Sequence, residues 1–277
     1  MIDLHMHSRA SDGTDSIAEL LENIRRAGIN IFSVTDHDTI DGTLEMESIV
    51  PKNMRFIRGI EFSCKTAAGK CHILGYGFDS ENEDFKQMLE EGRMRRRNKL
   101  ERRLEFLKSE FGIEFTDNEV SKLRSMNSVG KPHLGNFLVE HGFSADKNSA
   151  IEKYINPCKT ESDRLDGEKV VRAILSAGGI PVLAHPFGGT NEKEVPLEKF
   201  ERQVEILRGS GLMGLECYYS KYDESQIGLL LKAAEKNGLC VSAGSDYHGK
   251  NKKVSLGEVS KSGVEVSPEM LTILSLV

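Results

Sequence analysis

The histidines are the residues whose placement most directly indicates chemistry. Six of the eight lie at the ends of predicted strands or in one predicted hairpin, each near an acid or another histidine: His5, His7, His37, His72, His185 and His248. Because alternate side chains of a strand point to the same face, two residues spaced like His5 and His7, or like Asp246 and His248, can reach one ion. A single histidine is usually an ordinary core or surface residue, but random placement would scatter six of them over helices and loops. The pattern therefore predicts a polynuclear metal site.

Three carboxylates complete the candidate ligand set. Asp12 lies in the turn sequence Ser11-Asp12-Gly13, which suits a reversal that returns a carboxylate over the strand end. A tight reversal at residues 67–69 sets His72 beside Glu61 in a hairpin. The nine candidate ligands are His5, His7, Asp12, His37, Glu61, His72, His185, Asp246 and His248. Because an open catalytic ion takes three or four protein ligands and a carboxylate can bridge two ions, nine ligands fit three ions.

The donor set narrows the metal and the substrate. Imidazole with carboxylate and without thiolate favours Zn²⁺, Mn²⁺ or Fe²⁺ over Mg²⁺ or Ca²⁺, which prefer oxygen ligands. Three divalent ions held by three carboxylates leave a charge of about +3, which a phosphate dianion and a bound hydroxide would neutralise and a neutral amide would not. Further hydroxides would balance the site equally well, so the charge indicates a phosphate ester without requiring one.

Strands and helices must position these residues. They are predicted by an alternation of short runs rich in Val, Ile and Phe with amphipathic stretches. This alternation is typical of a parallel sheet or barrel of βα units, whose strands end at one rim. Ser16 with Glu19 forms a capping box for the first helix, and Gly28 is placed to end it. The predicted strands are 1–5, 31–35, 55–63, 180–184, 213–218 and 239–243, and the predicted helices are 16–27, 168–177, 197–208 and 225–237.

Residues 80–163 break the alternation and contain no convincing strand. One apolar stripe at helical spacing consists of Leu100, Leu104, Leu107 and Phe111. A second helix is expected near residues 132–140. We therefore expect an inserted small helical domain, residues 80–162, within a barrel domain formed by residues 1–79 and 163–277.

The first helix of this insertion is unusually basic. Residues 86–108 contain nine basic and four acidic side chains, a local charge of +5 that includes Arg95, Arg96, Arg97, Lys99 and Arg103. Such a run is most simply a solvated helix face. The other interpretation is a surface that guides a short oligonucleotide toward the metal site.

The composition excludes several classes of protein. The 277 residues carry 37 Lys and Arg against 43 Asp and Glu, a formal net charge of −6, whereas non-specific binding of long nucleic acid needs a surplus of cations. No apolar stretch approaches the roughly 20 residues of a membrane helix, and the first residues lack the regions of a signal peptide, so we expect a cytoplasmic protein. The five cysteines form no C-x-x-C pair, so a disulfide framework is not expected. The sequence leaves the oligomeric state open.

Four motifs, in order over nearly the whole chain, carry a resemblance to a known family. They are Asp3-Leu4-His5-Met6-His7-Ser8, then Thr35-Asp36-His37-Asp38 with Glu61 and His72, then Ala184-His185-Pro186, and Ser245-Asp246-Tyr247-His248. The chain resembles the PHP (polymerase and histidinol phosphatase) superfamily. Within it, Ser11-Asp12-Gly13, the form of the second motif and the helical insertion are similar to the TrpH-like metal-dependent phosphoesterases. The resemblance implies an α/β fold, a distorted (β/α)7 TIM-like barrel, with a trinuclear metal site.

The resemblance also implies roles for individual residues. A first ion would be held by His5, His7, Glu61 and Asp246, a second by Asp12, His37 and His248, and a third by His72 and His185 with Glu61 shared. Gly130-Lys131-Pro132-His133 is similar to a Gly-Arg-Pro-His sequence in the insertions of such proteins, so Lys131 and His133 are expected to clamp phosphate, with Arg9 as a further candidate.

Two departures concern the substrate. Lys131 stands where similar proteins have arginine, and it offers a point charge in place of a bidentate fork. The stretch Asn156-Pro157-Cys158-Lys159-Thr160-Glu161-Ser162 stands where they have a glycine-rich, apolar sequence. His133 is equally well explained as an ordinary helix-start residue. Asp36 and Asp38 either orient an imidazole or stabilise a turn.

We therefore expect hydrolysis of phosphomonoesters of nucleotides, such as 3′,5′-nucleoside bisphosphates, or of the 5′ ends of short RNA. The nucleophile would be a metal-bridging hydroxide held by His5, His7, Asp12, His37, Asp246 and His248. A histidinol-phosphate phosphatase would use the same ligands. A proofreading module associated with a polymerase and a catalytically silent metal-binding or interaction domain are the other interpretations.

Overall fold

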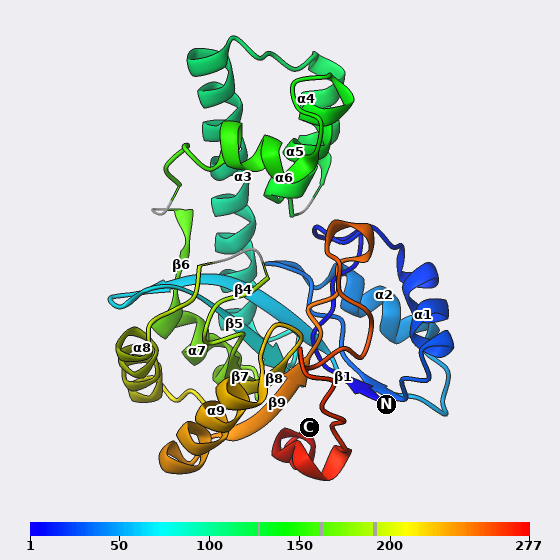
Figure 1. Ribbon diagram of the computed structural model, residues 1–277, viewed down its shortest axis with the longest axis vertical. Coiled ribbons are helices and arrows are strands. Elements are labelled where there is room, and N and C mark those ends of the chain that lie inside the picture. The colour runs from blue at the N-terminus through cyan, green and yellow to red at the C-terminus, as the bar shows by residue number, and fades with distance from the viewer. Residues whose placement is uncertain (127, 161–162, 191–192) are drawn as a thin grey trace.

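The computed structural model describes residues 1–126, 128–160, 163–190 and 193–277. They form an α/β fold in which two sheets are surrounded by helices, and an all-helical stretch stands above the sheets (Figure 1). The smaller sheet is parallel, in the order β1 (Ile2–Asp3), β2 (Ile31–Phe32), β3 (Arg55–Phe56). The larger sheet has the order β6 (Leu165–Asp166), β4 (Gly59–Thr66), β5 (Gly69–Tyr76), β7 (Ile180–Leu183), β8 (Gly214–Tyr219), β9 (Cys240–Gly244).

Isolated backbone bridges join the two sheets near the ends of β1 and β2. Met6 pairs with Tyr247 beyond β1 and β9, and His37 pairs with Glu61 between β2 and β4. Within the described residues the strands therefore form two bridged sheets, and no closed, continuous barrel is present. One strand, β5, also runs antiparallel to both of its neighbours, because it returns directly from β4 in a hairpin. The expected α/β class is confirmed.

The predicted strand 55–63 is two strands in different sheets, which the sequence pattern did not separate. The chain crosses from one sheet to the other at residues 57–58, and Gly59 begins β4. A Cβ on Gly59 would lie 2.0 Å from Ser33 Oγ and 2.7 Å from Thr35 Cγ2, so the crossing requires a residue without a side chain. The remaining predicted strands are present, with ends that differ by at most three residues.

The predicted helices of the framework are confirmed. They are α1 (Ile17–Arg26), α7 (Gly167–Ser176), α8 (Leu197–Gly209) and α9 (Glu224–Asn237). Ser16 and Glu19 form the expected capping box, and Gly28 follows the end of α1 with a φ of 69°. A further helix, α2 (Asp41–Ile49), was not predicted, because it has no side-chain cap and buries only Gly42, Thr43 and Met46.

The helical stretch expected from residue 80 onward is present. It contains α3 (Glu83–Phe111), α4 (Asp117–Ser125), α5 (Lys131–Glu140), α6 (Lys147–Ala150) and a π-helix, η1 (Ile151–Ile155). Its helices share an apolar cluster separate from that of the sheets, with Leu100, Leu107, Leu134 and Leu138 at its centre. Phe111, expected in the buried stripe, is 39% exposed. The expected boundary at residue 162, and residues 161–162 of the departing stretch, lie outside the described residues.

Three short 3₁₀ helices complete the described elements: η3 (Gly249–Asn251), η4 (Pro268–Met270) and η5 (Thr272–Ser275). Among the helices that the structure describes, none combines the length and the apolar character needed to cross a bilayer.

We expect Gly59→Ala to lower the free energy of unfolding by about 2 kcal/mol or more, because the added methyl group overlaps Ser33 and Thr35. Gly228→Ala is the matched control: Gly228 lies in α9 with open space around its Cα, so alanine should stabilise the helix by up to about 1 kcal/mol. Urea unfolding of both variants measures the difference, and equal stabilities would contradict the interpretation of Gly59.

Candidate metal centre

The carboxylate of Glu61 is the centre of the histidine cluster. Glu61 is fully buried on β4. Its Oε1 lies 2.8 Å from His72 Nδ1 and 3.0 Å from His185 Nε2. Its Oε2 lies 3.3 Å from His5 Nε2, 3.2 Å from His7 Nε2 and 3.0 Å from His37 Nδ1. Five of the six predicted imidazoles therefore face a single carboxylate.

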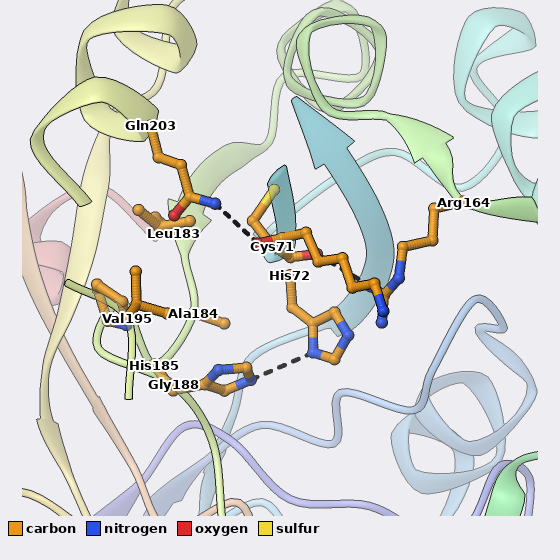
Figure 2. Close-up of a pocket in the computed structure, with 11 residues that line it drawn as sticks. Cys71, His72, Arg164, Leu183, Ala184, His185, Gly188, Val195 and Gln203 are labelled. Carbon is orange, nitrogen blue, oxygen red and sulfur yellow. Dashed lines mark hydrogen bonds between the residues drawn. The ribbon is translucent and has the colours of Figure 1, made fainter. Parts of the chain in front are cut away.

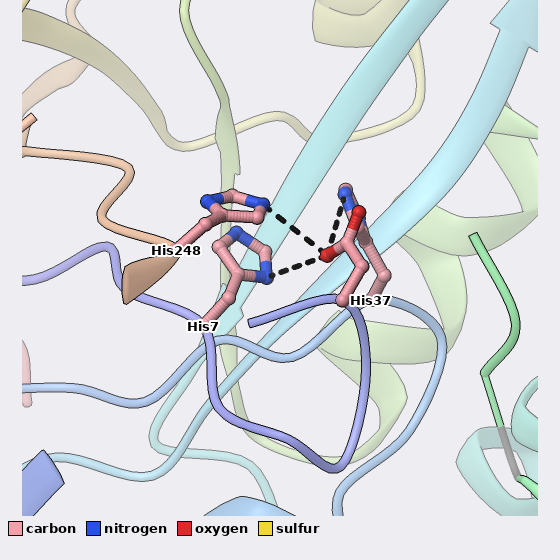
Figure 3. A group of neighbouring side chains, drawn as sticks. His7, His37 and His248 are labelled. Atoms are coloured by element: carbon pink, nitrogen blue, oxygen red, sulfur yellow. Dashed lines mark ion pairs between the residues drawn. The ribbon is translucent and has the colours of Figure 1, made fainter. Parts of the chain in front are cut away.

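A second group of imidazoles lies around the carboxylate of Asp12. Figure 3 shows His7, His37 and His248 converging on one carboxylate, which is that of Asp12. Asp12 Oδ1 lies 3.2 Å from His248 Nε2 and 4.0 Å from both His7 Nδ1 and His37 Nε2. The turn at residues 11–13 thus returns this carboxylate over the end of β1, as its sequence predicts.

Asp246 connects the two groups. Its Oδ1 lies 3.5 Å from His5 Nε2, 3.3 Å from His7 Nε2 and 3.4 Å from His248 Nδ1. Its other oxygen, Oδ2, accepts a hydrogen bond of 2.7 Å from the Tyr219 hydroxyl and one of 2.5 Å from the Lys252 ammonium group. One oxygen therefore faces the imidazoles while the other is fixed from behind.

Three sets of side chains could each hold a metal ion. Within each set the ligand atoms lie within 4.8 Å of one another: His5, His7, Glu61 and Asp246; His7, Asp12, His37 and His248; His37, Glu61 and His72. Asp12 Oδ1, Glu61 Oε2 and His37 Nδ1 are buried, and their close contacts with other ligand atoms lack hydrogen-bond geometry. Since buried polar atoms are normally paired, these three atoms fit ligands of a cation.

The grouping differs in part from the expectation. The first set contains the four expected residues, and the second adds His7 to the three expected ones. In the third set His37 replaces His185. His185 still lies close, with its Nε2 3.3 Å from His72 Nδ1, and Figure 2 shows the two ring nitrogens directed at each other.

Burial and mutual charge set the protonation of the cluster. Burial raises the pKa of Glu61, but the surrounding imidazoles, His37 first, hold it well below its usual range. Burial lowers the pKa of His37 to about 4, so this imidazole is neutral and able to ligate. At His7 burial also lowers the pKa, yet Asp246 and Glu61 outweigh it and raise the value to about 9. The carboxylates thus attract positive charge, which a divalent cation supplies in place of protons.

Glu216 orients two of the imidazole-bearing residues and was missed by the sequence analysis. Its Oε1 lies 2.8 Å from His5 Nδ1, and its Oε2 accepts a 2.7 Å hydrogen bond from the backbone N–H of His185. Metal-binding histidines commonly place their second ring nitrogen against such a carboxylate. The only sequence feature that could have indicated this role is that Glu216 is the single acid in an otherwise uncharged strand, Gly214–Tyr219. The structure buries every residue of that strand.

Asp36 and Asp38 stabilise loops. Asp36 accepts hydrogen bonds from the Ser8 N–H and from the hydroxyls of Ser8 and Ser11, at 2.8, 2.6 and 2.5 Å. Asp38 accepts a 2.8 Å hydrogen bond from Ser63 N–H. Of their two interpretations, the turn-stabilising one agrees with these contacts.

Backbone strain concentrates at the same rim. Among the described residues other than glycine, a positive φ occurs at Asp38 (52°), His185 (28°) and Asp246 (60°). Two of these are candidate ligands and the third follows His37. Such conformations persist where the surrounding structure enforces them, and they are typical of functional sites.

A cavity of about 660 Å³ opens between the ligand cluster and the helical stretch. Gly130 at the start of α5 lies against the cluster, since a Cβ there would be 3.1 Å from Asp12 Oδ2. Lys131 lines the cavity and donates a 2.6 Å hydrogen bond to Asn156 Oδ1. His133 accepts a 3.0 Å hydrogen bond from Gly130 N–H at Nδ1, which is a helix-start role.

Arg9 is placed apart from this cavity. Its side chain is 64% exposed, and its guanidinium donates to Thr14 O and to Glu19. The structure therefore places seven of the nine candidate ligands and Lys131 on the wall of one cavity. His5 and His7 are fully buried in contact with Glu61, and Arg9 lies on the surface of the loop before α1.

Comparisons with known proteins agree with this geometry. A family model described as PHP domain matches residues 3–93. The 3′,5′-nucleoside bisphosphate phosphatase of Chromobacterium violaceum is 26% identical over 255 residues, which cover 89% of this chain and 87% of that protein. The 5′-3′ exoribonuclease of Haemophilus influenzae is 27% identical over 260 residues, covering 89% of each chain.

A solved structure of a candidate metal-dependent phosphoesterase from Bifidobacterium adolescentis superposes with a TM-score of 0.79 at 27% identity. The match covers 93% of this chain and 91% of that chain. Together these similarities confirm the resemblance to the PHP family that the four motifs carry. The structural match also confirms the α/β fold.

Metal removal should reverse the pH dependence of stability. Without metal, His7 has a pKa of about 9 against an ordinary 6.5, so its protonation stabilises the fold below pH 6.5 and this contribution is lost as the pH rises through 9. With metal, protons compete for the ligands, so stability rises with pH over the same range. Melting temperatures measured from pH 6 to 9 with Mn²⁺ and with chelator test this, and parallel curves would contradict it.

Loss of the Glu216 carboxylate should weaken metal binding roughly 10- to 100-fold, because His5 and His185 lose the group that orients them. Glu216→Gln keeps one acceptor and should lose less than Glu216→Ala. Competition against a chelator of known affinity measures the change, with Glu205→Gln on the exposed side of α8 as the control. Unchanged affinity in a folded Glu216→Ala variant would contradict the assigned role.

Proposed function

We propose, from its membership of the PHP family of phosphate ester hydrolases, that this chain removes terminal phosphate groups from nucleotides, with 3′,5′-nucleoside bisphosphates and the 5′ ends of short RNA as the substrate classes. The observation that carries the proposal is the meeting of three ligand sets with a cation-lined cavity large enough for a nucleotide.

Three divalent ions, Zn²⁺, Mn²⁺ or Fe²⁺, are proposed for the three sets. His5, His7, Glu61 and Asp246 would hold the first, Asp12, His37 and His248 the second, and His72 and His185 with Glu61 the third. Bound there, the ions would lower the pKa of water toward ~7 and offset the charge of a phosphoryl group. Glu61 and Asp246 each lie close to at least three of the imidazoles, so both carboxylates would contribute oxygen ligands to these sets.

The chain's own residues bind and orient the substrate. Lys252 is held against Asp246 and lines the cavity, so its ammonium group places positive charge beside the phosphate. Lys131 enters the same cavity from the start of α5. We infer that residues 80–162 act as the substrate-binding domain and residues 1–79 with 163–277 as the catalytic domain.

The two bridged sheets support a distorted (β/α)7 arrangement. With the bridges between Met6 and Tyr247 and between His37 and Glu61, seven strands would form a ring around the ligands: β1, β2, β4, β5, β7, β8 and β9. Strand β5 is the antiparallel member of this ring. Each bridge includes a candidate ligand or the residue next to one, so the contacts that close the ring also position the ligands.

A histidinol-phosphate phosphatase would use the same ligands. Only the substrate distinguishes that activity from the proposed one. Turnover of a nucleoside bisphosphate should exceed that of histidinol phosphate. The reverse order would replace the nucleotide assignment while leaving the metal site intact.

His37→Ala and Asp246→Ala should leave a folded protein and remove nearly all phosphatase activity, because each change deletes a ligand from the cluster. His141→Ala is the matched control, since His141 is 43% exposed at the end of α5 and pairs with Glu119. Phosphate release and metal content are measured together. Activity retained with full metal content in either ligand variant would refute the assignment.

A further inference from the structure

The long helix α3 presents a row of cations to the cavity. Arg96, Lys99 and Arg103 are spaced three and four residues apart, so they lie on one helix face. Their residues are only 8%, 8% and 5% exposed. All three line the same cavity as Asp12, Glu61 and His248. The basic run was expected to form a solvated face, whereas the structure buries these three side chains.

Arg96 is occupied by the protein itself. Its Nε donates a 2.6 Å hydrogen bond to Asp38 Oδ2, and its Nη2 donates a 2.9 Å hydrogen bond to Ser63 Oγ. This pairing explains why Arg96 is buried. It also leaves Asp38 fully engaged, since its other oxygen accepts from the Ser63 N–H.

Lys99 and Arg103 have no such partner in the part of the chain that the structure describes. Neither side chain makes a hydrogen bond or an ion pair within 4.0 Å, and Arg103 Nε is buried without an acceptor. The acid near Arg103 is Asp163, which is paired with Arg102 at 3.3 Å. Because lysine and arginine are almost never fully buried unpaired, these two side chains are suited to binding an anion from outside the chain.

The electrostatics of Lys99 agree with a missing anion. Burial first, and then the neighbouring Arg96 and Arg164, lower its pKa to about 7. Three guanidinium groups, those of Arg96, Arg103 and Arg164, therefore surround this amine, and the carboxylate of Asp38 offsets them only in part. A bound dianion would restore the ammonium form.

We propose that Lys99 and Arg103 form a second phosphate subsite, which binds the phosphate one nucleoside away from the phosphate at the ligand cluster. The proposal rests on the nucleotide phosphatase function above and assigns its substrate class: esters that carry two phosphates. A guanidinium fork beside an ammonium group suits a phosphate, and the shared cavity places both groups on one ligand. The second phosphate comes either from a bisphosphate or from the next phosphodiester of an oligonucleotide.

Lys99→Met and Arg103→Met test the subsite, because methionine keeps an unbranched apolar stem and removes the charge. The quantity measured is the ratio of kcat/KM on a two-phosphate substrate to that on the mononucleotide with only the scissile phosphate. A 3′,5′-nucleoside bisphosphate and a 5′-phosphorylated dinucleotide serve as separate two-phosphate substrates. We expect each variant to lower the ratio about tenfold or more, as for loss of one charge-assisted hydrogen bond.

Arg97→Met is the matched control: Arg97 carries the same charge on the same helix, and its side chain is exposed. It should leave the ratio unchanged. A ratio that falls for the bisphosphate alone assigns the subsite to a terminal phosphate, and one that falls for the dinucleotide alone assigns it to a phosphodiester; either supports the proposal. Ratios that stay unchanged for both, or that fall equally in Arg97→Met, overturn it.

Melting temperatures distinguish a phosphate-binding role of Lys99 and Arg103 from a purely structural role. Removing a buried unpaired cation should raise the melting temperature of the free protein in Lys99→Met and Arg103→Met, while the rise produced by added bisphosphate should shrink. Lower stability with an undiminished bisphosphate effect overturns the subsite. If the wild-type protein hydrolyses none of the three substrates, the proposed function fails, and the bisphosphate effect on melting still tests the subsite independently.

Discussion

The structure depends on one electrostatic constraint: the fully buried carboxylate of Glu61 faces five imidazoles at about 3 Å. A carboxylate withdrawn from water needs positive charge close to both oxygens. Neutral imidazoles supply donors without charge, and His37 is held neutral by its own burial. Cations among these side chains would satisfy the acid and the imidazole lone pairs together, so burial of the cluster favours metal binding.

The framework meets this requirement by bringing ligands from strand ends in both sheets. Glu61 and His37 are joined by a backbone bridge, and the residues next to His5 and Asp246 by another. Each bridge fixes two ligands in register at once. The positive φ values of His185 and Asp246 show the accompanying strain, and Glu216 and Tyr219 on β8 hold the strained loops from the opposite side.

The sequence carried the local part of this design. The spacing of His5 and His7, the turn that returns Asp12 and the hairpin that brings the His72 side chain to Glu61 are local features, so strand periodicity and turn chemistry predict them. Glu216 is 211 residues from His5, and its role depends on strand order, which periodicity does not encode. The split at Gly59 was missed for the same reason, because the clash with Ser33 exists only after the sheets have formed. Helix α2 lacked a capping residue and a clear apolar stripe.

The cavity separates charged groups of opposite sign. Asp12 and Glu61 lie on one wall among the imidazoles, while Lys99 and Arg103 on α3 line another wall without acceptors. A closer approach would pair them, but the helical stretch is held in place by Gly130 against Asp12, and by Lys147, which donates to Asn251 at 2.9 and 2.8 Å. Asn251 in turn donates to Asp12 O. A fold that keeps both sets apart is complementary to a ligand system that is cationic at one end and anionic at the other, as metal ions with a phosphorylated substrate are.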